Sequence, residues 1–115
     1  MQFGKQYVIF ILTLLIAFFF YVISLSRYYS IQLFYYDFGI FAQIIWQLSQ
    51  FQIPIIHHVS LGEIVFLGDH FNPSLALVAP LFWITSDIRI LLLEQALVTA
   101  FSGFVLYKIA ERVHL

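Results

Sequence analysis

The sequence has no cysteine and few charged residues. Lys and Arg together number 5 and Asp and Glu number 6, so charged residues make up 10% of the 115 residues, whereas a soluble domain carries about 25%. The absence of cysteine excludes disulfide bonds, thiolate zinc sites and thiol nucleophiles. The formal net charge is −1 and no run of basic residues occurs, so nucleic acid is not an expected partner.

The chain is rich in apolar residues. Hydrophobic residues make up 63% of the chain, and 14 Phe dominate its aromatic residues. Such a surface would self-associate in water, because large apolar patches drive association. We therefore predict an all-α, multi-pass protein of the cell membrane with about three transmembrane helices, whose first partner is the lipid bilayer.

Two segments have the length and composition of membrane-spanning helices. Residues 7–25 carry no charge, and as a helix they are about 28 Å long. A cleaved signal peptide is the alternative for this segment, because a basic start and an apolar run are common to both. Residues 88–107 are predicted to form the other long span, with Ser86 or Asp87 as the helix cap.

A further predicted span, over 70–86, is marginal in length. Its apolar part, 73–84, is only about 18 Å long as a helix, so the polar residues at both ends must be included to cross a bilayer. Basic residues occur on both sides of the predicted spans, and the positive-inside rule therefore does not set the orientation.

Residues 26–72 form a polar loop after the first predicted span. Within it, apolar residues recur at steps of three and four while Gln residues share another face, which predicts an amphipathic interfacial helix over 38–51. The apolar positions are Phe41, Ile44, Ile45, Leu48 and Phe51, and the polar positions are Gln43, Gln47 and Gln50. Beyond Pro54, the β-prone segments 55–60 and 63–67 predict a short hairpin or an irregular excursion.

Asp37 is the first candidate for chemistry. It follows the first predicted span and comes directly before the interfacial helix, so its carboxylate is expected at the membrane surface. The alternative is a helix cap, since Asp accepts hydrogen bonds from a first helical turn and suits its positive end. The two roles are compatible, because one oxygen can cap the helix while the other binds a substrate or an ion.

Asp69 and His70 place a carboxylate and an imidazole side by side where the span over 70–86 is predicted to begin. Asp69 has the chemistry of a base or metal ligand, and His70 that of a proton shuttle or phosphate partner near neutral pH. The alternative is a capped helix start with Pro73 in its first turn.

His57 and His58 add two imidazoles to the same loop. Together with Asp37, Asp69 and His70 they make five ligands suited to a divalent metal. However, adjacent residues on a strand point to opposite faces, so the two histidines are poorly placed to grip one ion. No known metal-binding spacing matches, so the cofactor is unknown and a divalent metal is one option. The alternative for the two histidines is contact with water or lipid head groups at the interface.

Glu94 and Gln95 lie inside the predicted span over 88–107, where an ionised carboxylate is costly unless it is paired. Glu94 should therefore face a helix bundle, where it binds Arg89 or another helix, or lines a buried substrate path. The sequence contains no Gly-rich phosphate loop, GxSxG elbow or HExxH motif, which leaves soluble nucleotide, serine-hydrolase and zincin chemistry without support.

The ordered motifs of the chain resemble the start of a family of predicted bacterial and archaeal membrane proteins of unassigned function. The shared pattern is an acid followed by Gly and Phe, a Gln and a Trp in the next helix, a Gly-x-His-Phe-x-Pro motif and a later Gln. The matching positions are Asp37, Gly39, Phe41, Gln43, Trp46, Gly68, His70, Phe71, Pro73, Pro80 and Gln95.

That family in turn resembles the GT-C glycosyltransferases, multi-span enzymes that use lipid-phosphate-linked sugars. The resemblance implies that Asp37 is the catalytic acid, acting as base on the acceptor or as a metal ligand, while Asp69 and His70 assist at the sugar phosphate. It also implies a cytoplasmic N-terminus and an extracytoplasmic loop over 26–72. Such enzymes have many more helices than the roughly three expected here.

The resemblance implies that residues 1–115 are one membrane module, the N-terminal part of a GT-C-like transferase with a polyprenyl-phosphate-linked sugar donor. Alone, the module is expected to be inactive and to need further transmembrane helices from the same or another chain. One alternative is a non-catalytic membrane subunit or truncated relic that packs with partner helices. Another is a transporter element with Glu94 on the permeation route.

Overall fold

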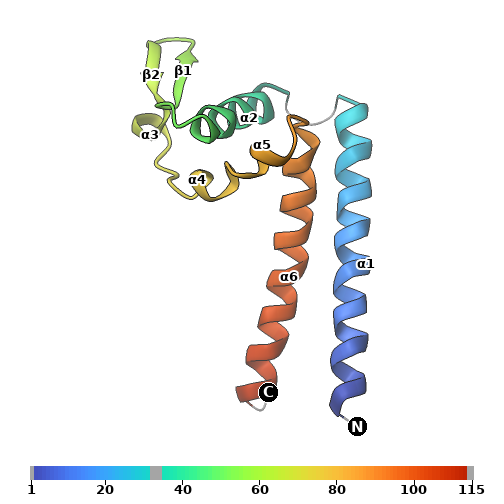
Figure 1. The fold of residues 1–115 in the computed structure, drawn as a ribbon. Helices are drawn as coiled ribbons and strands as arrows, with labels where there is room; N and C mark the ends of the chain where they lie inside the picture. The colour runs from blue at the N-terminus through green and yellow to red at the C-terminus, as the bar shows by residue number, and fades with distance from the viewer. Residues whose placement is uncertain (1, 32–34, 114–115) are drawn as a thin grey trace. The chain divides into compact units, whose positions relative to one another are not determined.

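The computed structural model describes residues 2–31 and 35–113 (Figure 1). Their internal contacts divide them into two compact units. The first unit, here called the helical pair, combines the described residues up to 30 with those from 92 onward. The second unit, here called the loop unit, holds the described residues from 31 to 91.

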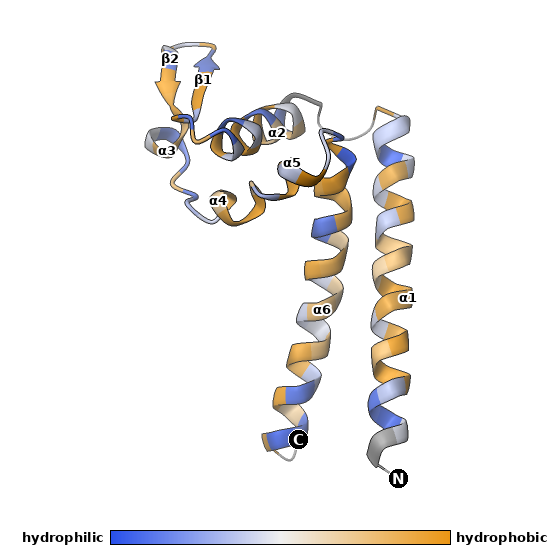
Figure 2. Cartoon of the chain, in the orientation of Figure 1, coloured by the Kyte–Doolittle hydropathy of each residue, from blue (hydrophilic) through white to orange (hydrophobic). Residues whose placement is uncertain are grey.

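The helical pair consists of α1 (Gln2–Tyr29) and most of α6 (Arg89–Val113). The helices are antiparallel, with the ring of Phe10 against the rings of Phe101 and Phe104 at centroid distances of 6.1 and 6.2 Å (Figure 1). Both helices are long and apolar enough to cross a membrane. Figure 2 shows α1 hydrophobic along its middle and more hydrophilic toward its ends.

Small side chains are buried along both helices of the pair. Thr13 and Ala17 on α1 lie four residues apart, as do Ala96 and Ala100 on α6, and all four are buried, so each helix presents one small-residue face. The Thr13 hydroxyl donates a hydrogen bond to the Ile9 carbonyl at 2.9 Å. Small residues let two backbones approach closely, which is a common basis of helix association in membranes.

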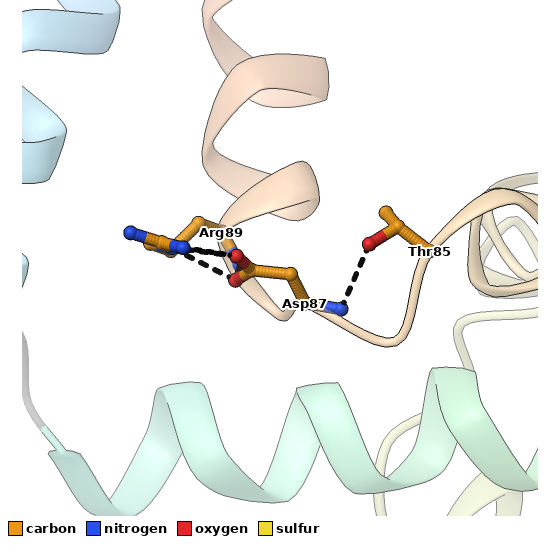
Figure 3. A network of polar contacts seen from close by, with 3 residues as sticks. All are labelled: Thr85, Asp87 and Arg89. Atoms are coloured by element: carbon orange, nitrogen blue, oxygen red, sulfur yellow. Dashed lines mark hydrogen bonds and ion pairs between the residues drawn. The ribbon is translucent and has the colours of Figure 1, made fainter.

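Asp87 caps the start of α6 (Figure 3). Its Oδ1 accepts hydrogen bonds from the backbone N–H and from Nε of Arg89, both at 2.9 Å, and the guanidinium also pairs with Oδ2. Thr85 Oγ1 accepts a hydrogen bond from the backbone N–H of Asp87 at 3.2 Å. The hydrogen bonds from Arg89 lower the pKa of Asp87 from 3.8 to about 2. Of the two caps predicted from the sequence, Asp87 is therefore the one whose side chain bonds the helix.

The loop unit contains one longer helix, a hairpin and three short helices. Their bounds are α2 (Tyr35–Ser49), β1 (Ile55–His58), β2 (Gly62–Val65), α3 (Phe66–Asp69), α4 (Leu75–Val78) and α5 (Leu81–Ile84). Both α4 and α5 pack against α2. Buried side chains form two clusters: Ala42, Ile45, Ala79 and Leu91 in one, and Ile44, Ile56 and Phe66 in the other.

The apolar face of α2 is buried by protein. Its Ile44 and Ile45 are 0% and 5% exposed, and they pack against the hairpin, α3 and α4. The helix predicted over 38–51 is present over 35–49, but the expectation that this face lies in lipid needs correction. The chain that follows the helix folds back and covers the face, which the periodicity of one helix cannot reveal.

Helix α2 ends in a turn at Phe51, whose φ of 57° lies in the left-handed region that non-glycine residues rarely adopt. The backbone N–H of Gln52 bonds to the Gln47 carbonyl at 3.0 Å, as in a Schellman turn. The indole Nε1 of Trp83 donates to the Ser49 carbonyl at 2.7 Å. These bonds satisfy carbonyls that have no partner within a helix end.

Gln47 joins α2 to the hairpin. Its Oε1 accepts a hydrogen bond from the backbone N–H of Ile55 at 3.0 Å, and its Nε2 donates to the Ile55 carbonyl at 3.2 Å. The strands pair antiparallel from Ile55 opposite Val65 to His58 opposite Gly62. Gly62 has a φ of +75°, which glycine adopts without steric cost. Of the two options predicted for this segment, the hairpin is the one present.

The segment over 70–86 is not the continuous helix that was predicted. Pro80 lies between α4 and α5 and has no N–H to continue a helical ladder. Pro73 precedes α4 instead of lying in its first turn. The apolar stretch Leu75–Ile84 measures about 15 Å as a helix, half of a hydrocarbon core of about 30 Å. Within the described residues, α1 and α6 are the helices long enough to span.

Candidate functional site

A pocket in the loop unit brings together Asp37, Asp69 and His70, the three residues that the family resemblance implies are catalytic. Asp37 comes from α2, and Asp69 and His70 come from the end of α3. The pocket has a volume of about 240 Å³. Its other lining residues are Ile40, Phe41, Ile56, His57, His58, Val59 and Phe66. The site is thus assembled from α2, the hairpin and α3.

Asp37 lies in the first turn of α2, inside the helix, which begins at Tyr35. Its side chain is exposed, and within the described part of the chain its carboxylate makes no hydrogen bond or ion pair. A negative charge is favourable there because a helix N-terminus carries positive partial charge. The carboxylate is therefore available to accept a hydrogen bond or a proton from a ligand hydroxyl.

Asp69 is the last residue of α3, and His70 follows as its C-cap. His70 Nε2 lies 3.7 Å from Asp69 Oδ2, and the two side chains are 65% and 31% exposed. The backbone N–H of His70 bonds to the Phe66 carbonyl at 2.8 Å, and the His70 ring stands edge-on to Phe66 at 5.6 Å. The pair therefore closes a short helix and does not open the helix predicted over 70–86.

Apolar side chains form the floor of the pocket. Phe66 is fully buried, and its ring packs edge-on against Phe41 at a centroid distance of 5.5 Å. Ile56 is also buried and belongs to the same cluster. An aromatic floor beneath polar groups suits a ligand that has both an apolar face and hydroxyl groups.

His57 and His58 occupy adjacent positions on β1, where side chains alternate between faces. His58 Nδ1 accepts hydrogen bonds from the backbone N–H groups of Ser60 and Leu61 at 3.1 and 3.3 Å. Neutral His58 thus carries its proton on Nε2 and shapes the hairpin turn. His57 is exposed and stands opposite Glu63. The adjacent strand positions, on which the sequence argument against a shared ion rests, are thus present.

The described residues of the pocket do not group three protein ligands around one point. Among the residues that the structure describes, no three His, Asp or Glu side chains are grouped so that they could hold one ion. A structural zinc or calcium site needs at least that many protein ligands, whereas Mg²⁺ binds one or two carboxylates together with substrate phosphates. The described lining contains two carboxylates and no Lys or Arg. The pocket is therefore electronegative while its histidines are neutral.

Three residues that hold the loop unit together, of which Phe66 also lines the pocket, carry no signal of these roles in the sequence. Phe66 lies in an apolar run whose inward-facing members the alternation does not single out. The sequence predicts Gln47 to be a solvent-facing polar residue. Its hydrogen bonds to the backbone of Ile55 cannot be predicted, because only the fold brings the two residues together. Trp83 is predicted to be part of the span over 70–86, whereas its indole N–H bonds to the Ser49 carbonyl at the end of α2.

The two long apolar helices are candidate membrane spans, and most of the loop unit lies between them in sequence. The model of the family of predicted membrane proteins DUF2079 matches residues 27–115, which includes the whole loop unit and α6. The chain belongs to this family. No curated protein and no solved structure matches the chain.

Proposed function

We propose that the pocket is a sugar-transfer site and that residues 1–115 form the N-terminal membrane module of a GT-C-like glycosyltransferase with a polyprenyl-phosphate-linked donor. The observation that carries the proposal is the convergence of Asp37, Asp69 and His70 on one pocket. Two separate motifs supply these residues, and their meeting on an aromatic floor is typical of a ligand site. The membrane setting fits a lipid-linked donor, whose head group stays at the bilayer surface.

In this proposal Asp37 is the base for the acceptor. The acceptor hydroxyl gives its proton to the carboxylate as its oxygen bonds to the anomeric carbon of the donor sugar. The bond from that carbon to the phosphate oxygen breaks, and polyprenyl phosphate leaves with the electron pair. His70 donates a hydrogen bond to the phosphate, and Asp69, 3.7 Å from the imidazole, orients it.

The charge of the pocket indicates how such a donor would lie. Two carboxylates without Lys or Arg repel a phosphate and favour neutral hydroxyl groups as hydrogen-bond donors. The sugar and the acceptor hydroxyl therefore occupy the pocket. The phosphate lies at the rim beside His70, whose side chain is 65% exposed.

Asp37→Asn in the full-length protein tests the proposal. Membranes that carry the protein receive a polyprenyl-phosphate-linked hexose with a labelled sugar, and consumption of the donor is measured. We expect turnover to fall by about 100-fold or more, because a positioned general base contributes about 10²–10⁴-fold. Glu63→Gln is the matched control, since Glu63 is an exposed carboxylate of the same unit outside the pocket lining, and it should keep wild-type turnover. Unchanged turnover in Asp37→Asn contradicts the catalytic role.

A role in packing with partner helices, or in transport, is the second candidate and is favoured by Glu94. This residue lies in α6, where lipid makes an unpaired carboxylate costly, and it has no hydrogen bond or ion pair to any described residue. Arg89 pairs with Asp87 instead. The cellular activity of the full-length protein is compared in two variants. If Glu94→Gln abolishes that activity while Asp37→Asn keeps it, the result favours this candidate over the transferase.

A further inference from the structure

Many large apolar side chains of the loop unit are exposed outside the pocket lining. Five of them, from the turn after α2 and from the segment that contains α4 and α5, are here called the apolar patch. Phe51, Leu77 and Ile84 are 87%, 83% and 79% exposed, and Ile53 and Trp83 are 67% and 60% exposed. Single exposed apolar residues are ordinary on soluble proteins, but large apolar areas mark an interaction surface. Three of the five come from the short segment that contains α4 and α5.

That segment is apolar on both of its faces. The residues that pack toward the core beneath α2 are Leu75, Val78, Ala79 and Phe82. Leu77, Trp83 and Ile84 remain exposed on the outside. Residues 70–86 include no Lys, Arg, Asp or Glu, and Figure 2 shows α4 and α5 as mainly hydrophobic. A segment that is apolar all round needs apolar surroundings on its outer side as well.

Trp83 needs no water for its polar atom. Its indole N–H is bonded to the Ser49 carbonyl at 2.7 Å, and its ring lies 5.9 Å from the ring of Phe51. The rings of Phe51 and Trp83 therefore expose only carbon atoms where α5 meets the turn after α2. Aromatic side chains of this kind gather where a bilayer meets water.

Chain length keeps the patch near the start of a candidate span. Ile84 precedes Arg89, the first residue of α6, by five residues, which is at most about 18 Å of extended chain. The Asp87–Arg89 ion pair lies between them in sequence, with side chains that are 39% and 42% exposed. A charged pair at this point indicates that the water boundary of the bilayer is close to the patch.

We propose that the apolar patch is a lipid anchor, whose side chains enter the boundary between head groups and acyl chains of the bilayer. The stretch Leu75–Ile84 is about 15 Å long as a helix, too short for a hydrocarbon core of about 30 Å. It therefore lies on one leaflet without crossing the membrane. The anchor holds the loop unit, and with it the pocket, at the membrane surface. This inference does not depend on the sugar-transfer proposal.

The two tryptophans of the chain give a direct test. Trp83 belongs to the patch, whereas Trp46 is on α2 and is 47% exposed outside the patch. Trp46→Phe leaves Trp83 as the sole fluorophore, and Trp83→Phe leaves Trp46. Each variant of the 115-residue chain is reconstituted into phosphatidylcholine and phosphatidylglycerol vesicles, with and without lipids brominated on the acyl chain. Aqueous iodide is added in a parallel measurement.

We expect brominated lipid to quench Trp83 strongly and iodide to quench it weakly, with Trp46 quenched less by lipid than Trp83. Quenching of Trp83 by iodide alone overturns the proposal, because the patch then faces water. Protection of Trp83 from both quenchers also overturns it, because another protein surface then covers the patch.

A second readout does not rely on tryptophan. Because the chain has no cysteine, Leu77→Cys and Gln43→Cys each introduce a single site for a spin label without any background. Leu77 is in the patch and Gln43 is exposed on α2 outside it. We expect the label at position 77 to be more accessible to oxygen, which concentrates in lipid, than to a water-soluble nickel chelate. If the labels at positions 77 and 43 have the same ratio of accessibility to oxygen and to the nickel chelate, the result contradicts the lipid anchor.

Discussion

Asp37 and Asp87 are both carboxylates near the start of a helix, and they differ in what they bind. Asp87 accepts hydrogen bonds from Arg89 and caps α6. Asp37 lies in the first turn of α2 and has no hydrogen bond or ion pair to any described residue. The first carboxylate is committed to structure. The second remains available to a ligand, which is why it is the residue proposed for chemistry.

The Asp87 carboxyl should titrate well below a free one. Its pKa is lowered from 3.8 to about 2, chiefly by the side-chain hydrogen bonds from Arg89. A depressed pKa means that the pairing stabilises the fold above pH 3.8 and that this contribution disappears as the pH falls through about 2. A carbon-detected NMR titration of the carboxyl should give a midpoint near 2. In Arg89→Gln the midpoint should rise toward 3.8, and a midpoint that does not move contradicts the assignment to Arg89.

Gln47 should hold the hairpin against α2 through its two hydrogen bonds to Ile55. Gln47→Leu removes both, and we expect a loss of about 1 kcal/mol in local stability, since each net hydrogen bond contributes about 0.5–1.5 kcal/mol and these are exposed. Hydrogen exchange at the Ile55 amide should become about fivefold faster. Gln43→Leu on the exposed face of the same helix is the control and should leave that amide unchanged. If the two substitutions change hydrogen exchange at the Ile55 amide equally, Gln47 does not hold the hairpin against α2.

At the scale of elements, helices with a regular apolar period were predictable and their burial was not. The spacing of Ile44, Ile45 and Leu48 predicts α2 because such positions share one helical face. The same spacing does not tell lipid from protein, and the face is covered by protein. For residues 70–86, apolar composition predicts a helix, but Pro80 and the packing of one face on α2 divide it into α4 and α5.

The hairpin turn depends on the backbone of Gly62, whose φ is +75°. Gly62→Ala should lower the stability of the hairpin by about 1 kcal/mol, because an L side chain in the left-handed region costs about 1–2 kcal/mol. No atom lies within 4 Å of the added methyl at Gly62 or at Gly68, so crowding contributes at neither position. Gly68→Ala, where φ is not positive, is therefore the control. Hydrogen exchange across β1 and β2 should report a faster-opening hairpin in the first variant alone, and an equal change in both contradicts the backbone argument.

At the scale of the whole molecule, the sequence offers the candidate site residues but not their assembly in one pocket. Asp37 and the Asp69–His70 pair stand out because polar groups are rare in so apolar a chain. That they line one pocket depends on the fold of the hairpin and on α3, including the burial of Phe66. Such contacts between distant segments leave no periodic trace in the sequence. The location in a membrane, by contrast, follows from composition and agrees with the family to which the chain belongs.

The central claim is that Asp37 and His70 act on one bound sugar donor, and a double-mutant cycle on the full-length protein tests it most directly. Turnover of a polyprenyl-phosphate-linked hexose is measured for Asp37→Asn, for His70→Gln and for the double variant. Residues that act as one catalytic unit lose activity non-additively. The account predicts that both single variants are impaired and that the double variant is little slower than the slower of them. Losses that multiply in full, or wild-type turnover in either single variant, would contradict it.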